Sequence, residues 1–229
     1  MYINTNTDTM TLASERSEFI RKVYLNLAMG FAGFIALESF LVTWQPAVEL
    51  AQKMVAGNNW LIVLLAFMGV SWVANAWAVN GATLSKQYAG FALYVIAESV
   101  IFLPLLIVAN TIAPDTIPQA GIITAALTTG ISAYAFFSKK DFSFLGSFLT
   151  IASFVALGII VCAILFGMQL GLWFSGAMIV FAGLVVLYQT SAIIRQYRND
   201  QYVAAALGLF AAIALMFWYI LQFLMARRD

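Results

Sequence analysis

The chain has 229 residues, of which 63% are hydrophobic and 9% are charged, and its mean hydropathy is +0.94. Soluble domains have roughly 45–50% apolar and about 25% charged residues, so this composition excludes an ordinary soluble protein and predicts a multi-pass protein of the lipid bilayer. The net charge of +1 argues against nucleic acid as a partner, and the absence of histidine excludes Ser-His-Asp and Cys-His nucleophiles and histidine zinc sites.

The chain opens with a polar stretch from Met1 to about Glu18 that is rich in Thr, Ser and Asn. This stretch lacks the basic start, the apolar core and the cleavage site of a secretory signal peptide. We expect residues 1–18 to form a flexible cytoplasmic tail and residues 19–229 to form one transmembrane domain.

Seven apolar runs follow, each close to the roughly 20 residues that a helix needs to cross a bilayer. The expected spans are 24–44, 60–79, 88–109, 117–137, 144–166, 172–190 and 202–224. The predicted fold is therefore all-α, a bundle of seven transmembrane helices joined by short loops. No room remains for a separate soluble domain.

The basic residues predict the orientation of the bundle. Eight of the 11 Lys and Arg residues precede the first span or lie in the second, fourth and sixth loops, whereas Lys53, Arg227 and Arg228 lie on the other side. Cytoplasmic loops carry an excess of Lys and Arg. We therefore expect a cytoplasmic N-terminus and a C-terminus on the outer side.

Two acidic residues fall inside the expected spans, Glu38 in the first and Glu98 in the third. A charged side chain at such depth costs roughly 2.5–3.5 kcal/mol, so these residues usually face the protein interior or a water-filled cavity. Neither has a basic partner in the central part of a span, so we expect both carboxyls to be neutral or proton-sensitive near neutral pH. Glu98, near the midplane, is the main candidate; a neutral acid that is hydrogen-bonded between helices is the alternative.

Amides and hydroxyls gather in the half of the spans that we assign to the cytoplasmic side. They are Asn26, Asn75, Ser132, Gln189 and Thr190. These side chains are candidates to line a shallow cytoplasmic cavity from which water reaches Glu98, although interhelical hydrogen bonding alone also accounts for them. Gly30 with Gly33, and Gly176 with Gly183, predict close contacts between helices.

Three segments resemble the Bax inhibitor (transmembrane Bax-inhibitor motif) family, and the resemblance covers most of the chain after the polar stretch. The segments are KKDFSFLG at 139–146, LYQTS at 187–191 followed by Ile193 and Ile194, and ALGLF at 206–210 leading to Phe217 and Tyr219. The resemblance implies a central helix wrapped by the other helices. It also implies an inner-membrane location, since the layout is similar to that of a bacterial member that modulates the membrane protease FtsH.

In some members of that family, two aspartates on the last two helices share a proton and gate a calcium leak. The matching positions here carry Gln189 and Ala212, so both carboxylates are replaced. A pair of like acids gives such a site its pH response. The resemblance therefore does not imply that this chain conducts calcium by the same proton-gated mechanism. Glu98 is a candidate replacement from the third span.

These observations leave two main functions open. The first is a regulatory protein of the bacterial inner membrane that engages an FtsH-like protease. The second is a leak pathway for calcium, protons or other ions with Glu98 at its centre, and a secondary transporter is a third alternative. We expect no enzymatic activity, no catalytic residue, no cofactor and no resident metal.

Overall fold

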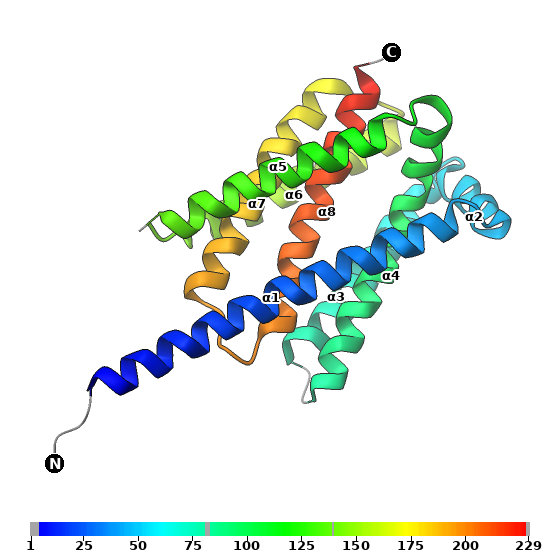
Figure 1. Ribbon diagram of the computed structural model, residues 1–229. Coiled ribbons are helices and arrows are strands. Elements are labelled where there is room, and N and C mark those ends of the chain that lie inside the picture. The colour runs from blue at the N-terminus through cyan, green and yellow to red at the C-terminus, as the bar shows by residue number, and fades with distance from the viewer. Residues whose placement is uncertain (1–4, 81–82, 139, 228–229) are drawn as a thin grey trace.

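The computed structural model describes residues 5–80, 83–138 and 140–227, with side chains described from Ser14 onward. Within these ranges the chain forms eight α-helices and no strand (Figure 1). They are α1 Thr5–Leu41, α2 Gln45–Val55, α3 Asn59–Asn80, α4 Leu84–Ile112, α5 Thr116–Phe137, α6 Leu145–Phe166, α7 Gly171–Arg195 and α8 Tyr202–Ala226. All but α2 are long and apolar enough to cross a membrane, which confirms the predicted all-α bundle of seven spans.

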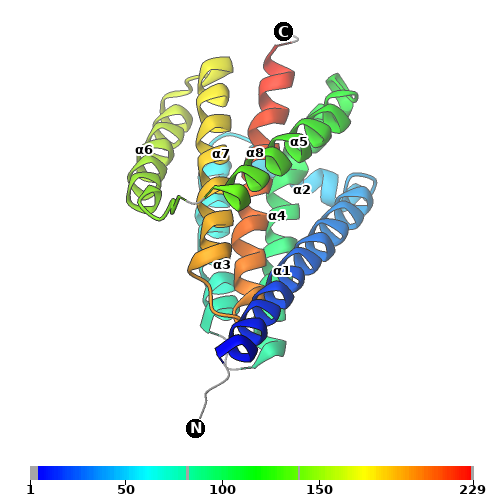
Figure 2. The ribbon, with the colours of Figure 1, turned by 60° about the vertical axis from the view of Figure 1, so that its left-hand side comes forward.

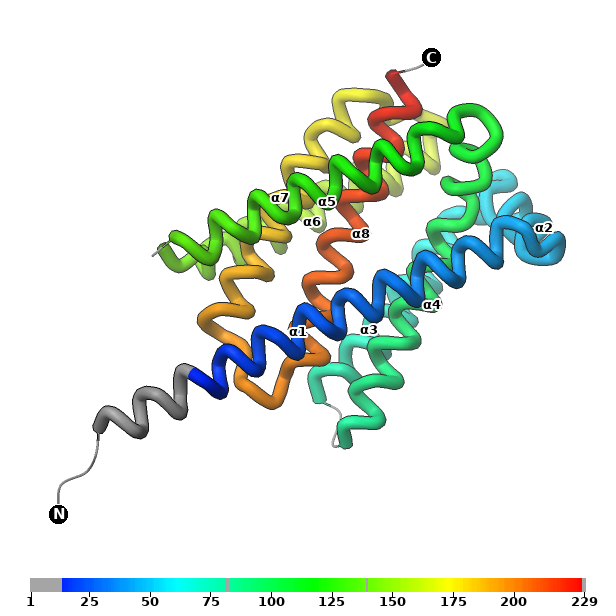
Figure 3. The backbone as a smooth tube through the Cα atoms, viewed as in Figure 1, coloured from blue at the N-terminus to red at the C-terminus, as the bar shows by residue number. Residues whose placement is uncertain are grey.

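Helix α8 is the centre of the bundle. Fourteen of its 25 residues are buried, against two of 22 in α3 and two of 22 in α6. It contacts α1, α3, α4, α5 and α7, and Figure 3 traces it between α7 and α4, with α1 crossing over its first part. Half of the residues from Val203 to Phe210, in its first part, are Ala or Gly, which let neighbouring helices approach closely in a membrane. The central helix implied by the family resemblance is therefore present.

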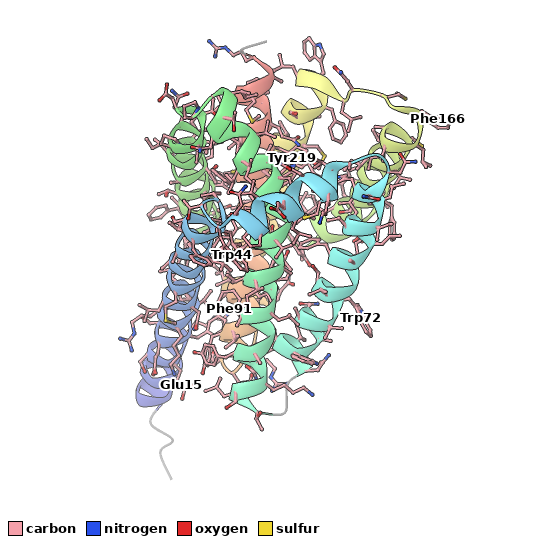
Figure 4. The ribbon with its side chains drawn as sticks, turned by 90° about the vertical axis from the view of Figure 1, so that its right-hand side faces the viewer. Glu15, Trp44, Trp72, Phe91, Phe166 and Tyr219 are labelled. Carbon is pink, nitrogen blue, oxygen red and sulfur yellow. The ribbon has the colours of Figure 1, made fainter. Side chains whose placement is uncertain are left out.

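Helix α6 lies at the edge of the bundle. Its main neighbours are α7 and α3, and Figure 2 shows it outside α7. Figure 4 shows the side chains of Phe166 on α6 and Trp72 on α3 pointing outward, and these are 74% and 73% exposed. Phe91 and Tyr219, in contrast, lie inside the bundle and are buried. The outward apolar side chains form the surface that faces lipid.

One helix lies in a segment for which we predicted only a loop. Helix α2 has 11 residues, too few to cross a bilayer, so the length of an apolar run does not predict it. Its buried residues, Ala47, Ala51 and Met54, repeat every three to four positions, and Ala47 and Ala51 pack with Leu103 of α4. The spacing is that of an amphipathic helix with one buried face.

Helix α1 begins earlier than we predicted. Residues 5–18, which we expected to belong to a flexible tail, continue the first span as helix, and residues 1–4 of that tail lie outside the described residues. Once a helix is nucleated, each further residue adds a hydrogen bond at little cost. Arg16 also binds the turn between α7 and α8, which fixes this part of α1 on the bundle.

The connections and helix ends define two ends of the molecule. The basic end comprises the first part of α1 and the connections α3–α4, α5–α6 and α7–α8; Arg195 at the end of α7 donates a hydrogen bond to the Ser138 carbonyl across two of these connections, at 3.3 Å. The opposite end comprises α2, the connections α4–α5 and α6–α7, and the last turn of α8. Lys139 and Arg228, used to predict the orientation, lie outside the described residues.

The tight contact between α3 and α4 depends on a glycine that the sequence spacing did not reveal. A Cβ atom added at Gly90 would lie 2.5 Å from the backbone oxygen of Ala74, a distance that real Cβ atoms do not reach. Among the glycines that we singled out, Gly30 is also confined, since a Cβ atom there would lie 2.6 Å from the Phe91 ring. The other three have only ordinary contacts or open space around them.

Candidate functional site

Glu98 lies midway along α4 and is 6% exposed. It lines a cavity of about 600 Å³ that is bounded by α3, α4, α6, α7 and α8. We call this space the Glu98 cavity. The sequence predicted that Glu98 faces the protein interior, and its burial agrees with that prediction.

The Glu98 cavity reaches the end of the bundle that we did not expect. Its wall includes Gln169 in the α6–α7 connection, Gly171 at the start of α7, and Gln222 and Ala226 near the end of α8, all at the opposite end of the molecule. We had expected water to reach Glu98 from the basic end. The small residues of α8 let its neighbours close in at the basic end, whereas α6 has few contacts and leaves space toward the opposite end.

The carboxyl of Glu98 is incompletely bonded. Its Oε2 atom is buried and has no hydrogen-bond partner among the described residues. Tyr94, one turn earlier on α4, interacts with the carboxyl through its side chain. The described residues that line the cavity include no Lys or Arg. An ionised Glu98 therefore has no cation to pair with among the described residues of the cavity wall.

Aromatic rings form much of the cavity wall. Trp60 of α3 stacks on Trp218 of α8 with ring centroids 6.3 Å apart, and Phe102 of α4 meets Trp218 edge-on at 4.9 Å. Phe67, Phe174 and Tyr219 also line the space. The site thus joins one acidic group to an aromatic surface contributed by four helices.

Glu38 occupies a different place. It is 5% exposed on α1, and both of its carboxyl oxygens are buried without a hydrogen-bond partner in the described part of the chain. It lines neither the Glu98 cavity nor the second cavity described below. The two acids that the sequence singled out are therefore separate features.

The polar residues near the basic end do not converge on one cavity. Asn26 is buried, donates a hydrogen bond from Nδ2 to the Lys22 carbonyl at 2.8 Å, and lines a second cavity of about 430 Å³ between α1 and α4. Ser132 and Thr190 bond to each other across α5 and α7, with their hydroxyl oxygens 3.3 Å apart. Asn75 is exposed on α3 and lines neither cavity.

The positions of the family's acid pair are filled differently here. Gln189 of α7 packs closely against Gly208 of α8. A Cβ atom added at Gly208 would lie 2.9 Å from the Oε1 atom of Gln189. That oxygen is buried and has no partner within the described residues. Ala212, one turn after Gly208, is buried and contributes a methyl group. Among the described residues no cluster of three or more His, Cys, Asp or Glu side chains is suited to hold a metal ion.

Arg16 makes a contact that sequence reasoning missed. Its Nη1 atom donates hydrogen bonds to the Tyr197 carbonyl at 2.7 Å and to Asn199 Oδ1 at 2.9 Å, and Nη2 donates to the Ile193 carbonyl. The last carbonyls of a helix lack intrahelical partners and carry partial negative charge, so a guanidinium suits the end of α7. We had interpreted Arg16 only as a topology signal, because no local pattern links it to residues about 180 positions away.

The same turn contains an ion pair. Arg198 donates two hydrogen bonds to the carboxyl of Asp200, and this bonding holds the pKa of Asp200 below its ordinary value. Both side chains are exposed, so the pair adds little to the free energy of unfolding, and its main effect is to hold the conformation of the turn.

The chain matches one family model and is similar to proteins from bacteria, a virus and mouse. The family model described as "Inhibitor of apoptosis-promoting Bax1" matches residues 16–229. An uncharacterized protein of Pseudomonas aeruginosa is 29% identical over 218 residues, which cover 91% of this chain and 89% of the relative. The Golgi anti-apoptotic protein of vaccinia virus is 28% identical over 222 residues, with 91% and 85% coverage. Protein lifeguard 4 of Mus musculus is 29% identical over 228 residues, with 92% and 86% coverage.

Proposed function

Because this chain belongs to the Bax inhibitor family, we propose that it is a regulatory protein of the bacterial inner membrane that modulates an FtsH-like membrane protease. The resemblance in layout to YccA, a bacterial member that modulates FtsH, supports this function. The relative from Pseudomonas aeruginosa, which aligns with 91% of this chain, supports a bacterial setting. The vaccinia relative is named as a Golgi anti-apoptotic protein. We extend to this chain only the regulatory role that this name implies, and not the Golgi location.

The observation that carries this proposal is the form of α1 at the basic end. The helix starts at Thr5, before Arg16, and continues without a break into the first span. Arg16 holds the base of this extension through its bonds to Tyr197 and Asn199. The excess of basic residues at this end supports a cytoplasmic position. A polar helical segment that precedes this fixed point offers a protease a handle outside the bilayer.

Deletion of residues 2–13 tests the handle, because it spares Arg16 and the bundle. We expect the shortened protein to persist longer in cells that contain FtsH and to co-purify with the protease less efficiently than the full chain. A second variant with residues 2–13 scrambled keeps the length and composition and should restore both properties. Unchanged lifetime and unchanged co-purification after the deletion would contradict the proposal.

A second candidate function rests on Glu98. A buried carboxyl oxygen without a partner, beside a cavity within the membrane-spanning bundle, is a feature that ion and proton pathways use. On this alternative the protein is a proton-sensitive leak for calcium or other ions, and opening of the bundle lets water reach Glu98.

Flux measurements in proteoliposomes test the leak. Glu98→Gln keeps a hydrogen-bonding side chain of the same shape but cannot titrate, so it should leave the fold intact and remove the pH dependence of any calcium or proton flux. Glu38→Gln is the matched control, since Glu38 is equally buried but lines neither cavity. A Glu98→Gln protein that retains the full pH response would exclude Glu98 as the sensor.

A further inference from the structure

We propose that the Glu98 cavity binds a lipophilic organic cation, a small molecule that carries one ammonium or phosphonium group on an apolar body. This inference is independent of the proposed protease modulation and of ion conduction. It rests on the size of the cavity, the charge of its wall and its aromatic surface.

The cavity has the dimensions of a small-molecule site. Its volume of about 600 Å³ lies inside the range of roughly 300–1,000 Å³ that is typical of ligand pockets. Five helices bound it, and α6, which closes one side, has few neighbours and few buried residues. A ligand dissolved in the apolar part of the bilayer can therefore reach the cavity beside α6.

The charge of the wall selects a cation. Glu98 is the one acidic residue among the described residues that line the cavity, and none of them is Lys or Arg. An organic cation in the cavity supplies the counter-charge that the Glu98 carboxyl lacks among the residues of the wall. An anionic ligand would be repelled by the ionised carboxyl. A bare calcium ion needs six to eight oxygen ligands, far more than this largely apolar wall provides.

The aromatic surface selects an organic, lipophilic cation over a small hydrated one. Cations are attracted to the faces of Trp, Tyr and Phe rings within about 6 Å of the ring centroid. The Trp60–Trp218 stack and Phe102 supply such rings, and Phe67 and Phe174 supply apolar surface for the rest of the molecule. Gln169 and Gln222 place polar groups toward the opposite end of the bundle.

Equilibrium binding of radiolabelled tetraphenylphosphonium to the full chain in nanodiscs tests the proposal, with empty nanodiscs as the background. This probe carries a permanent charge, and triphenylphosphine oxide is a neutral analogue with three of its rings. We expect saturable binding to the wild-type protein, with the neutral analogue competing at least tenfold more weakly than unlabelled probe. Absence of saturable binding, or equal competition by the neutral analogue, would overturn the proposal.

Variants locate the site. Glu98→Gln should weaken binding at least tenfold, whereas Glu38→Gln, a change at an equally buried acid outside the cavity, should leave it unchanged. Ile164→Trp places a large ring in the cavity from α6 and leaves the Glu98 carboxyl unchanged. We expect this variant to lose binding of the probe because the ring fills the space that the probe would occupy. Thermal unfolding of each variant in the same nanodiscs reports whether it is folded. Wild-type affinity in folded Ile164→Trp or Glu98→Gln protein would show that the cation binds elsewhere.

Discussion

At the scale of single residues, the two buried acids show how much surroundings matter. Glu38 and Glu98 are alike in type, in burial and in the apolar sequence around them. Glu98 lines a cavity with aromatic walls and has Tyr94 beside it, whereas Glu38 lines neither cavity. The same chemical group is thus a candidate ligand for a cation in one place and a buried polar group between helices in the other.

Arg16 is the residue whose role depends most on tertiary contact. We predict that Arg16→Ala lowers the free energy of unfolding by about 1–2 kcal/mol, because several charge-assisted hydrogen bonds to the end of α7 are lost. Arg16→Lys should recover only part of this, since a lysine lacks the planar fork. Thermal or denaturant unfolding in detergent measures the effect.

Arg21→Ala is the control for the Arg16 variant. Arg21 is exposed on the same helix and carries the same charge, so its removal has the same effect on the charge balance across the membrane. We expect a change within about 0.5 kcal/mol for this surface position. Equal destabilisation by the two alanine variants would show that the bonds of Arg16 contribute nothing beyond its charge.

At the scale of elements, the contact between α3 and α4 requires a glycine at position 90. Gly90→Ala would put a methyl group against the Ala74 backbone, and neither helix can yield without moving as a whole. We predict destabilisation by about 1–3 kcal/mol, the usual cost of overpacking a tight interface. Unfolding measurements in detergent, together with the yield of folded protein, check this prediction.

Gly69→Ala separates packing from helix propensity. Gly69 lies within α3, is exposed and has no atom within 4 Å of an added Cβ atom, so alanine should be neutral or slightly stabilising there. If both alanine variants were equally stable, the α3–α4 contact would have to be looser than the structure shows.

Helix α2 is the helix that the pattern of apolar runs does not predict. The criterion of about 20 apolar residues detects spans and necessarily misses an 11-residue helix. The spacing of Ala47, Ala51 and Met54 was visible in the sequence. What the sequence did not reveal is the partner, because Leu103 lies about fifty residues away on the middle of a different span.

At the scale of the whole molecule, the orientation in the membrane is the property that most affects function. Seven described basic residues lie at the basic end and two at the opposite end; the first group is Arg16, Arg21, Lys22, Lys86, Lys140, Arg195 and Arg198, and the second is Lys53 and Arg227. The positive-inside rule predicts that the basic end faces the cytoplasm. The Glu98 cavity would then extend toward the outer side of the membrane.

Reporter fusions measure this orientation. Alkaline phosphatase needs the disulfide-permissive periplasm to fold, so a fusion at the C-terminus should be active and a fusion in the α7–α8 turn should be inactive. The reverse pattern would place the N-terminal extension of α1 outside the cell. It would also remove the basis for a handle that is reached by a cytoplasmic protease domain.

The sequence by itself determined the class of protein, the seven spans, the division of basic residues between the two ends and the family. These properties depend on local composition and length, because a bilayer requires about 20 apolar residues for each crossing and excludes charge from its centre. For the same reason the burial of Glu98 was predictable, since an acid is too costly in lipid.

Only the tertiary structure decided which face of each helix is inside. Lipid chains are as apolar as leucine, so the spanning helices carry apolar residues on all faces and no amphipathic pattern marks the buried one. Asn26 and Asn75 therefore looked alike, although the first is buried and the second is exposed. The cavity beside Glu98 extends toward the end away from the basic residues because α6 packs loosely while small residues of α8 let its neighbours pack tightly, and these are contacts between helices far apart in the chain.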